Sequence, residues 1–239
     1  MTQTQPKTSQ KAPVEGVLTG RAKNLALTGI FMSMAVSMLS MTVVGTSMPI
    51  IIADINGNQA AFTWVVTGTM LASAISTPIW GKLADLTSKK VLLQLSLILF
   101  TLGSALAGTA QDPGWLIAFR VLQGLGAGGL GALGQIVLAE IISPRERGKY
   151  MGIMGAIMAV STVGGPLLGG AITDAFGWRW NFYVAAPVAI VAIIVLQRTL
   201  HLHTEKRKIK IDYAGATPIS IGFSSLLIWV TLGGANFDW

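Results

Sequence analysis

Gly81-Lys82-Leu83-Ala84-Asp85-Leu86-Thr87-Ser88-Lys89-Lys90 is a charged run that lies between two long apolar stretches of the sequence. Of the 239 residues in the chain, only 11% are charged and 52% are hydrophobic, and the mean hydropathy is +0.63. A chain of this composition is more soluble in lipid than in water. We therefore predict an integral membrane protein in which this run is a short loop between two spanning helices.

Membrane-spanning helices need about 20 mostly apolar residues, because a helix satisfies its backbone polar groups internally where water is absent. Seven stretches meet this condition: Leu25 to Ile52, Phe62 to Trp80, Val91 to Ala110, Trp115 to Ile142, Tyr150 to Ala171, Phe182 to Leu196 and Ala214 to Leu232. The predicted fold class is therefore all-α and integral to the membrane.

Basic residues are almost confined to every second loop, and short loops rich in Lys and Arg stay in the cytoplasm. The basic loops hold Lys7, Lys11, Arg21 and Lys23, then Lys82, Lys89 and Lys90, then Arg145, Arg147 and Lys149, and finally Arg198, Lys206, Arg207, Lys208 and Lys210. The opposite loops hold Asp54, Asp112, Asp174 and Asp238, with Arg179 as their one base. We predict a multi-pass plasma-membrane protein with a cytoplasmic N-terminus and an external Trp239.

The net charge of +7 does not indicate nucleic-acid binding, because the basic residues are spread over loops between apolar spans. The chain has no cysteine, which excludes disulfides and thiolate metal sites. His201 and His203 lie in a basic loop whose one acidic residue between 201 and 210 is Glu205, and the sequence has no nucleophile motif. No enzymatic activity, metal site or cofactor is predicted.

Four motifs carry a resemblance to a known family. They are Gly81-x-Leu83-Ala84-Asp85-x-x-x-Lys89-Lys90, Arg120-x-x-Gln123-Gly124-x-Gly126-Ala127, Gly165-Pro166-x-x-Gly169-Gly170 and Trp178-Arg179-Trp180-Asn181-Phe182. In this order and spacing they resemble motifs of the major facilitator superfamily, and within it the 14-span drug:proton antiporters. The resemblance extends from Leu39 to Trp239.

The resemblance predicts how the chain is organised. Residues 1–23 are polar and basic and are predicted to be a disordered cytoplasmic tail. Residues 24–200 are expected to form the N-terminal six-helix bundle of the major facilitator fold, 201–211 a basic cytoplasmic loop, and 212–239 a seventh transmembrane helix with its external end. Such a short connection before the seventh span is typical of the 14-span group. The resemblance implies that about half of a transporter is absent, so the chain is expected to be a fragment or truncated product.

The first motif is predicted to act as a conformational latch. Gly81 lets another helix approach closely, and Asp85 can face the positive N-terminal end of that helix. In the resembling family this latch holds the outward-facing state, and its aspartate is also linked to a basic residue and to an acid at the end of span four. Lys89 and Glu140 match those two positions, and Lys90 completes the motif. The alternative is that Asp85 is solvated in a turn and opposes its neighbouring lysines.

Arg120, Gln123 and Gly124 form the second predicted site. A charged side chain within a span is costly, so Arg120 should face the protein interior with a polar partner, and Gln123 lies nearly one turn away. The resemblance assigns this arginine to the coupling of proton movement to conformation. The alternative is a structural arginine that is hydrogen-bonded to helix ends.

The fifth span contains a predicted antiporter hinge made of Gly165, Pro166, Gly169 and Gly170. Proline removes a backbone donor and bends a helix, while glycines allow close packing and bending. The resemblance implies a hinge and seal between the two halves of an antiporter. Plain small-residue packing is the alternative.

A substrate cavity is predicted at Ser33, Ser37, Ser40, Met41 and Thr69. Serines and methionines form adjacent stripes on the first span, and methionine adapts to varied apolar shapes. The family usually carries an aspartate where this chain has Ser40 and a tyrosine where it has Thr69. The alternative is that the serines pack against helices and the methionines meet lipid.

These features predict the N-terminal portion of a secondary transporter that exports drugs or other amphiphilic small molecules by alternating access. No acidic residue lies mid-membrane in the predicted spans, so a proton-carrying carboxylate is expected in the missing half. The expected partners are an amphiphilic substrate, protons and their gradient, the lipid bilayer, and a C-terminal half or another transporter half. The alternatives are a non-transporting membrane subunit with the same fold and a carrier for a specific metabolite.

Overall fold

The computed structural model describes residues 20–199 together with 222 and 225, and the elements in this part of the chain are all helices. They are α1 (Gly20–Asp54), α2 (Gln59–Leu86), α3 (Lys89–Ala107), α4 (Pro113–Ile141), α5 (Arg147–Phe176), α6 (Trp180–Tyr183) and α7 (Ala185–Thr199). Six helices, with α6 and α7 joined as one, are long and apolar enough to cross a membrane. The predicted all-α membrane fold is confirmed, whereas the basic loop (201–211) and the seventh span (214–232) lie outside the description.

The charged run between the second and third spans is mostly helix, so the prediction of a ten-residue loop is wrong. Helix α2 continues through Leu86 and α3 begins at Lys89, which leaves Thr87 and Ser88 as the connection. The backbone N–H and the hydroxyl of Thr87 both donate to the Leu83 carbonyl, each at 2.9 Å, and close the last turn of α2. Charged side chains on these end turns reach water, so the helix has no reason to stop where the apolar stretch stops.

Other helix ends also lie beyond the predicted spans. Helix α1 begins at Gly20, so the last four residues of the predicted tail (20–23) are helical. Helix α5 runs from Arg147 to Phe176 instead of from Tyr150 to Ala171. Hydropathy locates the part of a helix that lies in hydrocarbon, whereas capping and loop geometry decide where the helix ends.

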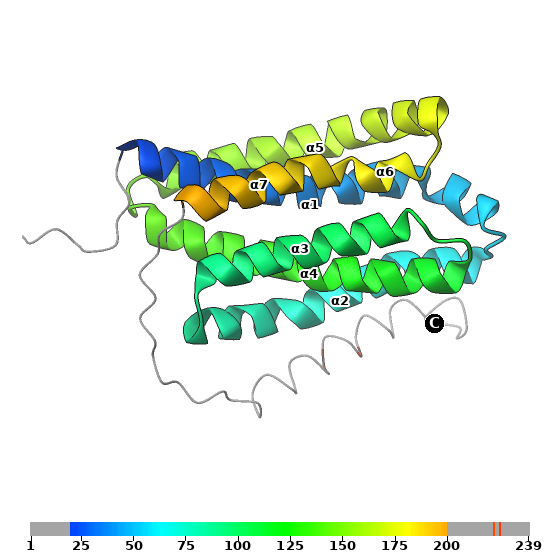
Figure 1. Ribbon diagram of the computed structural model, residues 1–239, viewed down its shortest axis with the longest axis horizontal. Helices are drawn as coiled ribbons and strands as arrows, with labels where there is room; N and C mark the ends of the chain where they lie inside the picture. Colours follow the sequence, from blue (N-terminus) through cyan, green and yellow to red (C-terminus); the bar gives the residue numbers. More distant parts are fainter. Residues whose placement is uncertain (1–19, 200–221, 223–224, 226–239) are drawn as a thin grey trace, which may run out of the picture.

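The bundle consists of two three-helix units (Figure 1). Helix α4 packs mainly on α2 and α3, and α1 packs mainly on α5 and α7. The two units meet through α1 and α4, with a second contact between α3 and α7. The central helices α1 and α4 carry five of the eleven buried polar side chains of the described residues, including the charged Arg120, and the other long helices surround them.

Glycines on α4 bring its neighbours close. A Cβ placed on Gly124 would collide with the carbonyl of Thr69 on α2, and one placed on Gly126 would collide with the backbone of Phe100 on α3. Small residues let helix backbones approach each other where no hydrophobic force drives association. Helix α4 is thereby fixed between α2 and α3, which fixes the place of its polar residues.

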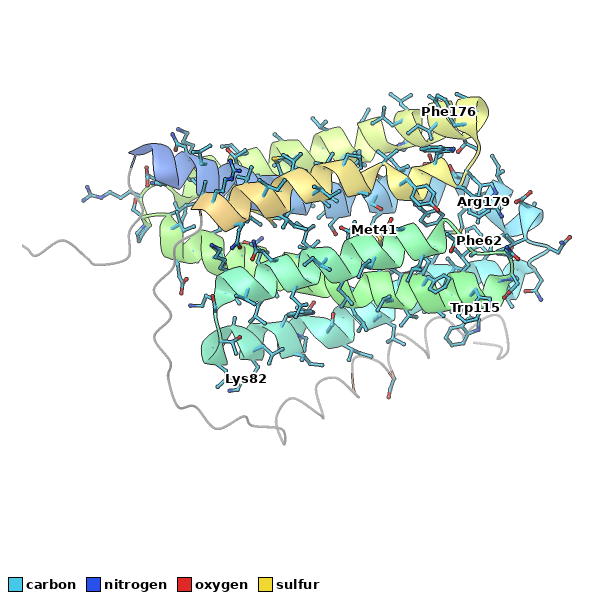
Figure 2. All side chains as sticks on the ribbon, in the orientation of Figure 1. Met41, Phe62, Lys82, Trp115, Phe176 and Arg179 are labelled. Carbon is cyan, nitrogen blue, oxygen red and sulfur yellow. The ribbon has the colours of Figure 1, made fainter. Side chains whose placement is uncertain are left out.

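Aromatic and acidic loop residues gather at one end of the bundle. Figure 2 shows Trp115, Phe176 and Arg179 at this end and Lys82 near the opposite end. Asp54 accepts hydrogen bonds from Trp178 Nε1 at 2.9 Å and from Arg179 at 3.3 Å. These bonds tie the α1–α2 connection to the α5–α6 connection.

Candidate functional site

A buried polar cluster joins α1 to α4 near the middle of the bundle. Arg120 is 3% exposed, and its Nη1 donates to Gln123 Oε1 at 2.6 Å. Gln123 Nε2 donates to Ser40 Oγ at 3.2 Å, and Arg120 Nη2 lies 3.7 Å from the Met41 sulfur. Met41 lies about midway along the bundle in Figure 2. The structure thus brings two predicted coupling residues together with two predicted cavity residues.

The cluster holds a positive charge among neutral groups. Nε of Arg120 is buried without a hydrogen-bond partner, and none of the three ion pairs in the described chain involves Arg120. A buried charge without a counter-charge is unfavourable in a protein and more so in a membrane. The arrangement can therefore attract a carboxylate or another anion, and Gln123 can hold Arg120 while none is present.

The other predicted cavity residues do not join this cluster. Ser33 donates to the Gly29 carbonyl at 2.8 Å, and Thr69 donates to the Val65 carbonyl at 2.7 Å, each within its own helix. Both side chains are fully buried, while Ser37 is half-buried. Short hydroxyl side chains commonly bond back to their own helix in this way. The packing alternative therefore describes Ser33 and Thr69 better than a shared cavity does.

The predicted latch residues are only partly brought together. Lys89 forms an ion pair with Glu140, which joins α3 to the end of α4. Lys90 instead donates to the carbonyl of Gln197 on α7 at 2.7 Å. Asp85 is exposed and has no hydrogen bond or ion pair within residues 20–199, including with its neighbouring lysines. A Cβ on Gly81 would have no neighbour within 4 Å among the residues that the structure describes, so none of them packs against α2 at this point.

The predicted hinge residues divide between two faces of α5. Cβ atoms on Gly165 and Gly169 would collide with Thr42 and Val43 on α1, so these two glycines allow close packing. Pro166 is exposed, and a Cβ on Gly170 would meet open space. Helix α5 runs through the proline without interruption. Gly165 and Gly169 thus pack closely on α1, and the hinge role of all four residues remains a prediction.

A second buried network was not assigned from the sequence. Asn181 Nδ2 donates to the hydroxyls of Ser47 on α1 and Thr173 on α5, each at 2.7 Å, and the two hydroxyls lie 2.9 Å apart. The network joins α1, α5 and α6 at the aromatic end of the bundle. An asparagine at the start of an apolar span was the available signal, because intramembrane polar residues require partners.

Glu146, which precedes α5, binds the first turns of α1. Lys23 Nζ lies 2.5 Å from Glu146 Oε2, and the Ser143 hydroxyl donates to the same oxygen at 3.0 Å. The hydrogen bond from Lys23, followed by that from Ser143, lowers the pKa of Glu146 from its ordinary value of 4.5. The contact fastens the connection between α4 and α5 to α1.

The lowered pKa of Glu146 predicts a pH-dependent stability. A carboxyl with a lower pKa in the folded state stabilises the fold above its unfolded pKa, and this contribution is lost as the pH falls through the folded value. We expect the unfolding temperature of the purified chain to fall below about pH 4.5, and to fall less steeply in Glu146→Gln. The measurement is thermal unfolding in detergent over a series of acidic buffers. Equal slopes in both proteins would show that the contact does not stabilise the fold.

Comparison with known proteins gives consistent matches. The family model described as the Major Facilitator Superfamily matches residues 30–237. Multidrug transporter protein MdtP of Bacillus subtilis (strain 168) is 38% identical over 217 residues, which is 91% of this chain and 40% of that protein. Multidrug resistance protein 3 of the same strain is 37% identical, and the match covers 88% of this chain and 41% of that protein. Efflux pump dotC of Dothistroma septosporum (strain NZE10 / CBS 128990) is 38% identical, and the match covers 94% of this chain and 40% of that protein.

Solved structures match in fold. The human organic anion transporter MFSD10 (TETRAN) matches with a TM-score of 0.65 at 16% identity, over 85% of this chain and 55% of that protein. A bacterial homologue of the human lysosomal transporter Spinster, in an inward-facing and unoccupied conformation, matches with a TM-score of 0.61 at 18% identity. This match covers 82% of this chain and 46% of that protein. The chain spans about two fifths of the length of the curated relatives named above.

Proposed function

The chain belongs to the Major Facilitator Superfamily, and we propose that it forms the N-terminal portion of a secondary transporter that exports drugs or other amphiphilic small molecules. It is a multi-pass membrane protein of a transporter family, which points to transport and not to an enzyme. The observation that carries the proposal is the buried Arg120, which contacts neutral partners only. Relatives named as multidrug transporters support the substrate class.

We infer that transport occurs by alternating access. This mechanism needs two helical bundles that rock against each other around a site near the membrane midplane. The described helices supply one bundle, and exposed apolar side chains on α5, such as Val163 and Leu167, suit contact with a second. The remaining length of the relatives, or another transporter half, would provide that second bundle.

A proton gradient is the proposed energy source. Its carboxylate would come from the second bundle, since no carboxylate contacts Arg120 in the part that the structure describes. A deprotonated carboxylate would draw Arg120 away from Gln123, and protonation would release it again. The two protonation states would then favour different arrangements of α1 and α4, which a coupled transporter requires. The proposed location is the plasma membrane, with the N-terminus and Lys82 on the cytoplasmic side.

The test is export from an efflux-deficient bacterial host. The chain alone and the chain extended to the length of its relatives are expressed, and ethidium accumulation is followed by fluorescence. We expect only the longer form to lower accumulation, and Asp85→Asn to abolish its effect. If both forms insert into the membrane and neither lowers accumulation, export of this dye is wrong. A carrier for a specific metabolite or a non-transporting subunit would then be the better explanation.

A further inference from the structure

A groove lies in the unit formed by α1, α5 and α7, away from the α2–α3 side of the bundle. Its volume is about 490 Å³, within the range of about 300 to 1,000 Å³ typical of small-molecule sites. None of the described residues that line it is charged, and its polar side chains are Ser40, Ser161 and Asn181. The groove therefore suits an apolar, uncharged molecule.

Small side chains on two helices create this groove. Ala156 and Gly164 on α5 and Ala185 on α7 line it, and a Cβ on Gly164 would meet open space. Val160 and Leu168 also line it and are 70% and 46% exposed, so the groove is open to the surface of the bundle. In a membrane this surface faces lipid or a neighbouring bundle. A ligand can therefore enter from the side without passing through the Arg120 cluster.

Two hydroxyl groups on the groove have hydrogen atoms to donate. Ser161 is 5% exposed and its hydroxyl forms no hydrogen bond in the described chain, although a helical serine commonly donates to its own helix, as Ser33 does. Ser40 is 3% exposed, and its oxygen accepts from Gln123 while its own O–H has no acceptor among the described residues. Both groups are therefore available to an acceptor on a ligand.

We propose that this groove binds an uncharged, elongated apolar molecule that carries a carbonyl oxygen, and that Ser40 and Ser161 donate hydrogen bonds to that oxygen. The two serines lie in the middle parts of α1 and α5, so the carbonyl sits deep in the bilayer and the apolar chain extends along α5. Ser40 also receives the hydrogen bond from Gln123, so the ligand lies beside the Arg120 cluster. Binding in this groove does not require that the chain takes part in export.

A photoreactive ketone tests the proposal directly. The probe is para-octylbenzophenone, added to the 239-residue chain in lipid nanodiscs. On irradiation its carbonyl oxygen takes a hydrogen atom from a nearby C–H group, and the two resulting radicals combine in a C–C bond, leaving a tertiary alcohol. We expect mass spectrometry to place the label on groove residues of α1 and α5, such as Leu39 and Ile157. A dialkyl ketone of similar length, which is not excited at the wavelength used for benzophenone, should compete, whereas para-octyldiphenylmethane, which lacks the carbonyl, should compete much less.

Matched variants separate the groove from general lipid contact. Gly164→Leu fills the groove, whereas Gly155→Leu places the same side chain in open space on the same helix outside it. We expect labelling to fall about tenfold in Gly164→Leu and to stay unchanged in Gly155→Leu. In Ser161→Ala, the probe concentration that gives half-maximal labelling should rise about fivefold, as the loss of one hydrogen bond predicts. Label spread evenly over exposed residues and unaffected by Gly164→Leu would overturn the site. Equal competition by the hydrocarbon would overturn the hydrogen bonds to the carbonyl.

Discussion

Replacing Arg120 with alanine in the transporter extended to full length is expected to abolish proton-driven ethidium export while leaving the protein folded. The guanidinium is buried, has neutral partners only and has one nitrogen without any partner. Removing a buried charge that lacks a counter-charge leaves no other charge unpaired, so stability should be unchanged or higher. Arg120→Lys is expected to lose most of the activity as well, because one ammonium does not reproduce the planar fork that contacts Gln123 and Met41.

The two explanations of Arg120 predict opposite pairs of results. A coupling arginine gives lost export with retained thermal stability, whereas a structural arginine gives retained export with a lower unfolding temperature. Export is measured as ethidium efflux on energising cells, and stability as thermal unfolding in detergent. Gln123→Glu is the matched second variant, since it places a permanent carboxylate 2.6 Å from the guanidinium where the amide oxygen now lies. It should raise stability and block export, because Arg120 would no longer respond to a second carboxylate.

The sequence predicts part of this site because some of its contacts are local. Arg120 and Gln123 are three residues apart and share a helix face, so their pairing follows from helical spacing. Ser40 and Met41 lie on another helix, and their contact with α4 depends on the register between two helices. Periodicity does not define that register. The serine and methionine stripes of the first span marked Ser40 and Met41, and the structure shows how they meet Gln123 and Arg120.

The same limit applies to the fold. Hydropathy predicted the six described spans, because each is an apolar stretch long enough for the bilayer. It did not predict that α2 continues to Leu86, which depends on the local bonds of Thr87. Nor did it predict the network of Asn181 with Ser47 and Thr173, whose members come from three helices. Contacts within a helix are readable from the sequence, and contacts between helices mostly are not.

Replacing Gly126 with alanine is expected to prevent stable packing of α3 on α4. The new methyl group would collide with the backbone of Phe100 and with the carbonyl oxygen of Ser96, and backbone atoms cannot move aside as a flexible side chain can. Overpacking of this kind costs about 3 kcal/mol, a large fraction of the stability of a typical domain. Gly131→Ala on the same helix is the control, because its methyl group would meet open space. The measurement is the monodisperse fraction on size-exclusion chromatography and the unfolding temperature in detergent.

This packing contact also positions the polar cluster. Gly103 on α3 faces the backbone of Gln123, so the approach of α3 to α4 fixes the residue that holds Arg120. A partly folded Gly126→Ala protein should therefore lose export together with stability, whereas Arg120→Ala should lose export alone. If Gly126→Ala and Gly131→Ala unfold at the same temperature as the unsubstituted chain, α3 and α4 do not lie close enough for this collision, and the prediction is wrong. The cluster would then depend on α1 for its geometry and not on the glycines of α4.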